Sequence, residues 1–105
     1  MKHNLLATGG DDNKITIWNM NTFERVWTSK KHRAIITSLA ISTDSKVLVA
    51  GSAEGFIKFW DVETKKTIKK VKGHSDHVSS LHFSNNNSTL LSSGWDGDII
   101  MWMFE

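Results

Sequence analysis

Hydrophobic and polar positions alternate along short segments of this chain, and the pattern returns with a step of 42 residues, from position 18 to 60 and from 60 to 102. Three sets of residues share this step: Trp18, Trp60 and Trp102; Leu6, Leu48 and Leu90; Ile15, Ile57 and Ile99. Such a period is typical of proteins built from one repeated supersecondary unit. The 105 residues therefore hold about two and a half copies of that unit.

The segments that end at each tryptophan have the pattern of β-strands. They are short, rich in β-branched and aromatic residues, and bounded by Gly, Asn or Asp, at residues 14–18, 56–60 and 98–102. A second strand precedes each one, at residues 5–8, 47–50 and 89–92. Between the two strands lie turns at residues 11–13, 53–55 and 95–97, where Gly or Asn allows a positive φ.

Two further kinds of strand complete the unit, and no segment keeps a helical period beyond a turn or two. One kind is expected at residues 35–41 and 78–83, and the other at residues 23–29 and 67–72. The sequence therefore predicts an all-β protein with four strands in each repeat.

Composition narrows the class of protein. The chain is 39% hydrophobic and 23% charged, which is too apolar for disorder, and no apolar run is long enough to span a bilayer. It has no cysteine, which excludes disulfides and thiolate metal sites, and its first apolar stretch is too short for a secretory signal. We expect an intracellular protein, cytoplasmic or nuclear. The net charge of +2 neither requires nor excludes nucleic acid.

The repeat resembles the WD-repeat family of β-propellers, whose mark is a Gly-His pair followed by strands and a Trp-Asp pair. Gly73-His74 and Trp60-Asp61 stand at these places. The other copies are degenerate: Lys31-His32, Trp18-Asn19 and Trp102-Met103. The resemblance implies a partial propeller of four-stranded antiparallel blades, one complete and two incomplete.

The expected blades are residues 1–30, without an innermost strand, 31–72, which is complete, and 73–105, without an outermost strand. Propellers close at about 4–8 blades, so we expect that this chain cannot form a ring alone. Direct head-to-tail joining would skip two strands at each junction, which makes simple self-closure a poor match. We expect a fragment of a larger propeller or a subunit of an assembly, and association of the isolated chain.

The family's structural tetrad consists of a His before the first strand, a Ser or Thr on the second, an Asp in the next turn and the Trp. The resemblance places it at His74, Ser92, Asp96 and Trp102 in the last copy; at His32, Glu54 and Trp60 in the middle copy; and at Thr8, Asp12 and Trp18 in the first. In the middle copy Ala50 replaces the hydroxyl and Glu54 replaces the Asp, so we expect that blade to be less well tied.

Chemical alternatives use the same residues. His74, Ser92 and Asp96 could be a hydrolase triad, but a nucleophile needs exposure and an oxyanion hole, and the blade architecture buries these side chains. His74 and His77 could be a metal-binding pair, but a metal site needs three or four ligands, and alternation along the strand from Val78 leaves the direction of His82 open. Residues 9–13 lack the ligand spacing of a calcium loop. We expect no catalytic residue, no metal and no cofactor.

An aromatic residue in a turn is the candidate for partner binding. Trp95 lies in the turn that, in propellers of this kind, opens on the same rim as the loop before the innermost strand. The expected rim residues are Trp95, His77, Arg33, Ile35, Asp11 and Ala53. An exposed indole beside His and Arg has the character of an interface anchor. The alternative is that Trp95 packs on a neighbouring blade.

Five lysines lie within eight positions, at Lys65, Lys66, Lys69, Lys70 and Lys72. They could form a phosphate-binding patch. We favour an outermost strand on which lysine prevents edge-to-edge aggregation, because no interleaved aromatic residue offers a stacking platform for bases.

The function these features favour is a non-enzymatic protein–protein interaction scaffold. Its partners would be proteins or peptides, together with further propeller blades or other chains that cover the sheet edges, and no membrane. The alternative is an RNA-associated propeller module of a ribonucleoprotein-processing complex, which the lysine run supports. A hydrolase is a weaker third possibility.

Overall fold

The computed structural model describes residues 5–9, 13–29, 35–42, 44, 46–84 and 88–103. Within these residues the chain forms ten β-strands. Their bounds are β1 (Leu5–Gly9), β2 (Ile15–Asn19), β3 (Arg25–Thr28), β4 (Ile36–Ile41), β5 (Val47–Ser52), β6 (Phe56–Asp61), β7 (Thr67–Lys72), β8 (Val78–Phe83), β9 (Thr89–Gly94) and β10 (Ile99–Met103). The predicted all-β fold is confirmed.

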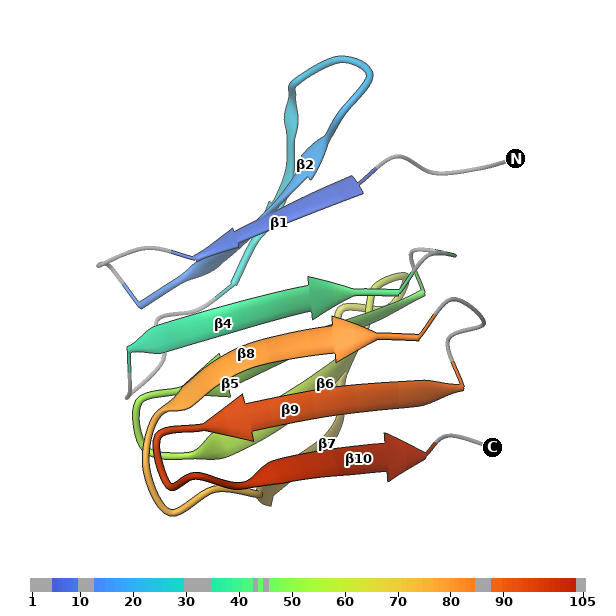
Figure 1. Ribbon diagram of the computed structural model, residues 1–105. Coiled ribbons are helices and arrows are strands. Elements are labelled where there is room, and N and C mark those ends of the chain that lie inside the picture. The colour runs from blue at the N-terminus through green and yellow to red at the C-terminus, as the bar shows by residue number, and fades with distance from the viewer. Residues whose placement is uncertain are drawn as a thin grey trace.

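The strands form three antiparallel sheets in which each strand pairs with its neighbour in sequence (Figure 1). The sheet orders are β1-β2-β3, β4-β5-β6-β7 and β8-β9-β10. The turns before β2, β6 and β10 contain Asn13, Gly55 and Gly97, which have φ values of 61°, 88° and 85°. Gly and Asn tolerate this left-handed conformation best, so the repeated turn residues fix the same hairpin in each copy.

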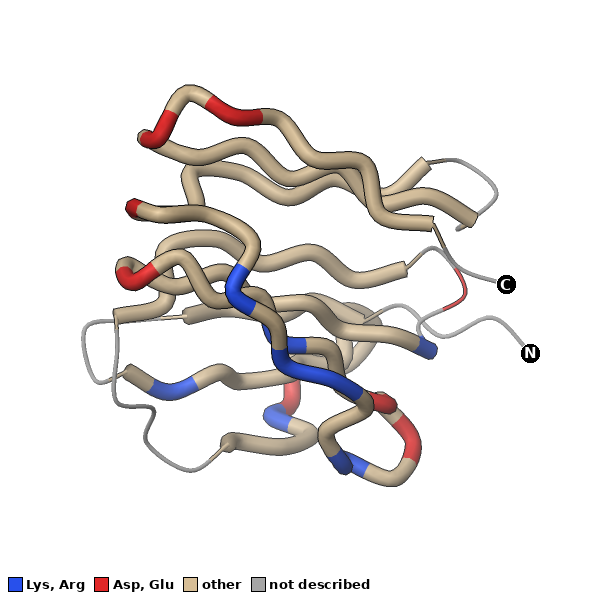
Figure 2. Tube along the Cα trace, turned by 90° about the horizontal axis from the view of Figure 1, so that it is seen from below, with Lys and Arg blue, Asp and Glu red and all other residues tan. Residues whose placement is uncertain are grey.

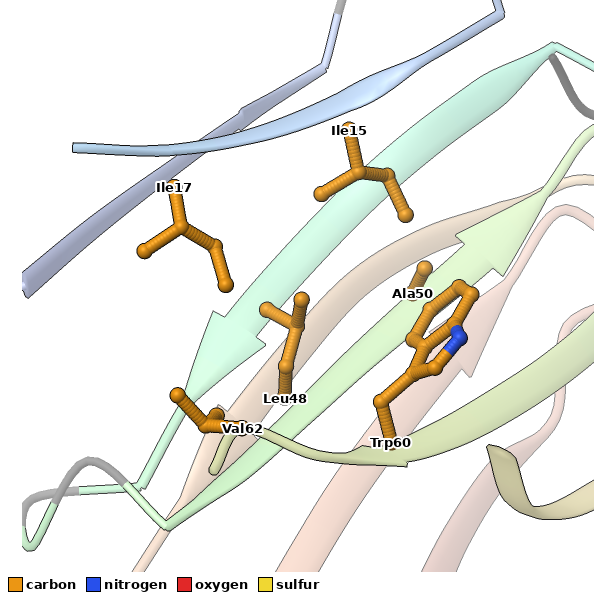
Figure 3. Close-up of a cluster of buried hydrophobic side chains, with 6 residues drawn as sticks. All are labelled: Ile15, Ile17, Leu48, Ala50, Trp60 and Val62. Carbon is orange, nitrogen blue, oxygen red and sulfur yellow. The ribbon is translucent and has the colours of Figure 1, made fainter. Parts of the chain in front are cut away.

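Two isoleucines join the β1–β3 sheet to the β4–β7 sheet. Ile15 and Ile17 project from β2 and are fully buried against a cluster on the next sheet (Figure 3). That cluster consists of Leu48, Ala50, Trp60 and Val62. Burying an aliphatic side chain of this size contributes about 1.5–3 kcal/mol, so these contacts hold the two sheets face to face.

The same register positions join the β4–β7 sheet to the β8–β10 sheet. Ile57 and Phe59, each 42 residues after an isoleucine of β2, pack with Val78, Phe83 and Leu90. The ring of Phe59 also meets Trp102 edge to face, with centroids 6.3 Å apart. One pattern of side chains therefore builds both interfaces between sheets.

Candidate functional site

A buried hydrogen-bonded network connects the turn before β10 to the strands of the β8–β10 sheet. His74 Nδ1 lies 3.1 Å from Asp96 Oδ1, and His74 Nε2 lies 2.9 Å from Ser92 Oγ. The indole Nε1 of Trp102 donates to the same Ser92 oxygen at 2.9 Å. The structure thus brings His74, Ser92, Asp96 and Trp102 together.

The donors and acceptors of this network fit one arrangement of protons. Asp96 accepts from the imidazole Nδ1–H, which leaves Nε2 as an acceptor for the Ser92 hydroxyl. Because Ser92 Oγ has two lone pairs, it also accepts the indole N–H of Trp102. Every polar atom in the chain of contacts has a partner, as buried groups require.

Two glycines make room for the network. A Cβ at Gly73 would lie 2.8 Å from Trp102 Cζ2, and a Cβ at Gly94 would lie 2.6 Å from His74 Nδ1. Gly73 belongs to the Gly-His pair that the sequence showed. Gly94 was missed, and its signal was the Ser-Gly at the end of β9, next to the turn that carries Asp96.

The tetrad residues of the first copy are partly described. Trp18 Nε1 donates to Thr8 Oγ1 at 2.9 Å, which is the same contact that Trp102 makes with Ser92. Asp12 lies outside the described residues, as does His32 of the middle copy.

The middle copy holds its turn in a different way. Ala50 is buried and Trp60 packs in the cluster with Ile15 and Ile17, while Glu54 is exposed. Ser52 Oγ accepts the backbone N–H groups of Glu54 and Phe56, at 3.3 and 3.2 Å. The Ser52 hydroxyl therefore stabilises the turn between β5 and β6, whereas the Asp96 carboxylate stabilises the corresponding turn of the last copy.

Backbone hydrogen bonds give Asp96 a lowered pKa. The N–H groups of Asp98 and Ser75 donate to its carboxylate and, with His74, lower the pKa from 3.8 to about 2. A carboxylate whose folded-state pKa is depressed stabilises the fold above pH 3.8, and this contribution is lost as the pH falls from 3.8 to about 2.

We expect Asp96→Asn to flatten the pH dependence of stability in that window, because asparagine carries no ionisable carboxylate. The measurement is the free energy of unfolding in urea at several values between pH 2 and 5, compared with wild type and with Asp98→Asn. Asp98 contributes its backbone N–H to the network, which asparagine keeps, so Asp98→Asn controls for the removal of a carboxylate from the same turn. Parallel curves for wild type and Asp96→Asn would contradict this account.

Trp95, which we expected on the rim, is exposed over 67% of its surface. Its indole stacks on the His77 ring, with centroids 4.2 Å apart and planes 19° from parallel, and its backbone N–H donates to His77 O. Asp76 Oδ1 lies 2.7 Å from His77 Nδ1, and this hydrogen bond lowers the pKa of the Asp76 carboxyl. The three residues form a fixed aromatic and acidic platform, which we call the Trp95 platform.

The middle copy repeats the backbone geometry of this platform without its aromatic rings. The backbone N–H of Ala53 donates to the carbonyl of Ile35, just as the backbone N–H of Trp95 donates to the carbonyl of His77. The side chain of Ile35 is exposed. The β5–β6 and β9–β10 turns and the starts of β4 and β8 lie at the same end of their sheets (Figure 1). Arg33 and Asp11 lie outside the described residues.

The lysine run lies mainly on β7, the outermost strand of the four-stranded sheet (Figure 2). Lys70 Nζ and Lys72 Nζ lie 4.6 and 5.9 Å from the ring centroid of Phe56 on β6. Lys58 also lies on β6, and its ammonium group is placed over the ring of Trp60. Burial, together with repulsion from Lys70, lowers the pKa of Lys58. An aromatic residue is therefore interleaved with the lysines across the strands, which the linear sequence did not show.

Two further features are absent from the described part of the chain. No group of three or more His, Cys, Asp or Glu residues there could hold a metal ion. No helix among the described residues is long and apolar enough to cross a membrane.

Antiparallel sheets that pack face to face in a row, with a His-Ser-Asp-Trp network at the turn before β10, define part of a β-propeller. Residues 1–86 match the family model described as the anaphase-promoting complex subunit 4 WD40 domain. The chain belongs to the WD40 repeat family, and the predicted family is confirmed. WD40 domains generally act as interaction scaffolds and are typically non-catalytic.

Solved structures share the fold. The computationally designed Ika4 protein superposes with a TM-score of 0.82 at 28% identity, covering 100% of this chain and 63% of that chain. The RRP9 WD40 repeats superpose with a TM-score of 0.85 at 23% identity, covering 94% of this chain and 32% of that chain. The chain thus spans less than two thirds of the length of these structures. A search of curated proteins found no match.

Proposed function

We propose that this chain is a non-enzymatic scaffold module that binds a protein or peptide partner through the Trp95 platform. The observation that carries the proposal is an exposed indole held in place by its neighbours. A large aromatic group in a turn, left in solvent, is the kind of residue that dominates the free energy of binding at protein interfaces.

The geometry of the platform supports this role. Stacking on His77 and the backbone hydrogen bond from Trp95 N–H fix the indole before a partner arrives, so less side-chain freedom is lost on binding. The Asp76 carboxylate, half exposed beside the rings, adds an acceptor for a donor of the partner. An apolar face next to a polar acceptor gives both affinity and orientation.

The buried network favours a structural role over a hydrolytic one. Ser92 and His74 are fully buried, and the Ser92 oxygen already receives the indole N–H of Trp102. A nucleophile has to reach its substrate, and a serine in this position is shielded from one.

The proposal includes the blade boundaries, at residues 1–30, 31–72 and 73–105. Each of the three sheets falls within one of these ranges, and the Gly73-His74 pair opens the third. Association with RNA is the weaker alternative. Its support is the set of Lys58, Lys70 and Lys72, but the Phe56 ring on which a base would stack is covered by two of those ammonium groups.

We expect Trp95→Ala to weaken partner binding about 30-fold, since interface anchors contribute about 2 kcal/mol or more. The probes are peptides selected from a random display library on the wild-type chain, and titration calorimetry measures each affinity. Phe23→Ala is the matched control, because Phe23 is an exposed aromatic residue in the β2–β3 loop. The thermal midpoint of Trp95→Ala should stay near that of wild type.

The outcomes separate two explanations. Equal affinities for wild type and Trp95→Ala would exclude the platform as the binding site. Unfolding of Trp95→Ala would mean that the indole belongs to the core, and the proposed rim would be wrong.

A further inference from the structure

The 42-residue step lets each exposed residue be compared with its counterpart in a buried interface. The β4–β7 sheet lies between the other two sheets, so each of those has one face without a neighbour among the described residues. One is the face of β9 and β10 that is turned away from the β4–β7 sheet. The other is the face of β1 and β2 that is turned away from the β4–β7 sheet. We call them the β9–β10 outer face and the β1–β2 outer face.

The β9–β10 outer face carries the residues that insert into the next sheet elsewhere in the chain. Ile99 is 75% exposed, whereas Ile15 and Ile57 at the same register are fully buried between sheets. Met101 is 62% exposed, whereas its counterpart Phe59 is buried. This face is therefore the inserting half of an interface that occurs twice inside the molecule.

The β1–β2 outer face carries the receiving half. Leu6 is 44% exposed, whereas Leu48 at the same register is fully buried beneath Ile15 and Ile17. Met20 is 42% exposed and stands where Val62 closes the same cluster. Trp18 lies directly opposite Leu6 on the neighbouring strand, as Trp60 lies opposite Leu48.

We propose that the β9–β10 outer face of one copy of this chain docks on the β1–β2 outer face of a second copy. The argument is that each face repeats one side of the two interfaces that the chain builds within itself. Ile99 and Met101 would enter between Leu6, Trp18 and Met20 as Ile15 and Ile17 enter the cluster around Leu48. The contact joins two different surfaces, so it adds copies head to tail and is not confined to a dimer.

The contact between copies is smaller than the internal ones. In the internal interface Ile36, Leu39 and Ile41 of β4 also pack against the cluster, and among the described residues no strand precedes β1 in the same way. Association therefore depends on protein concentration. The missing counterpart of β4 among the described residues is also the reason why copies of this chain are a poor match for closing a ring by themselves.

The test uses one variant of each face and the mixture of the two. Sedimentation velocity over a range of concentrations measures the mass of wild type, Met101→Glu and Leu6→Glu. Ile68→Glu is the control, because Ile68 is 58% exposed on β7 and belongs to neither face. Circular dichroism establishes that each variant keeps its strands. We expect that it does, because all three substituted side chains are exposed.

We expect the mass of wild type and of Ile68→Glu to rise with concentration above the 11.9 kDa of one chain. Each face variant alone should stay at 11.9 kDa, since every contact needs both faces. An equimolar mixture should form a heterodimer of about twice that mass, because one intact face of each kind remains. A monomeric wild type at every concentration would overturn the proposal, and so would a mixture that stays monomeric while wild type associates.

Discussion

Replacing His74 by alanine should lower the free energy of unfolding by about 2–5 kcal/mol, through a cavity and the loss of two hydrogen bonds. The imidazole is fully buried and connects Asp96 to Ser92, so its removal takes one hydrogen-bond partner from each group. Asp96 keeps the N–H groups of Ser75 and Asp98, and Ser92 keeps the indole N–H of Trp102. A domain of this size has a total stability of about 5–15 kcal/mol, so the variant loses a large share of it.

His77→Ala is the matched control for that variant. His77 is only partly buried and lies in the turn just three positions later, so its removal should change the free energy of unfolding by about 0.5 kcal/mol or less. Urea denaturation with linear extrapolation measures both variants. If both histidine variants lost the same stability, the network around His74 would not be what holds this turn.

Much of the fold could be predicted because the same physical requirement returns at the same place in each copy. Turns that need a positive φ select Gly or Asn, and strands between two sheets select large apolar residues such as Ile15 and Ile57. The tetrad residues were placed through the resemblance to the WD-repeat family, whose motif positions this repeat matches. Regular positions in a repeat constrain residue type strongly enough to be seen in the sequence.

Other contacts could not be predicted because they depend on register and on neighbouring strands. Lys70 and Lys72 cover Phe56 only because β6 and β7 pair with Phe56 opposite Lys72. The sequence placed Trp95 and His77 on one rim, but the stack of their rings, 18 positions apart, depends on the pairing of β8 with β9. A linear pattern shows which face a residue occupies, but it does not show which side chain of the next strand meets it.

The burial of a side chain could not be predicted from its place in the repeat, because residues at the same repeat position have different neighbours. Ile57 and Ile99 occupy the same position in their repeats, yet one is buried between two sheets and the other is exposed. Their side chains are identical, so only the number of neighbouring sheets distinguishes core from surface. The same reasoning makes the outer faces candidates for contact with another chain.

Substituting Gly94 by alanine should destabilise the chain by about 2–4 kcal/mol, because the new methyl group has no free volume. Its Cβ would lie 2.6 Å from His74 Nδ1 and 2.9 Å from Asp96 Oδ1. The imidazole and the carboxylate would have to move, and the hydrogen bond between them would lengthen. The free energy of unfolding in urea measures the loss.

Gly97→Ala separates crowding from backbone strain. Gly97 has a φ of 85° but no atom within 4 Å of a Cβ built there, so alanine should cost only about 1–2 kcal/mol of left-handed strain. The two variants should also differ in acid. Gly94→Ala crowds Asp96 Oδ1, the atom that accepts the Asp98 N–H, and should weaken the loss of stability between pH 3.8 and about 2, whereas Gly97→Ala keeps it. An unchanged acid response in Gly94→Ala would mean that the carboxylate keeps its hydrogen bonds from the backbone beside the methyl group.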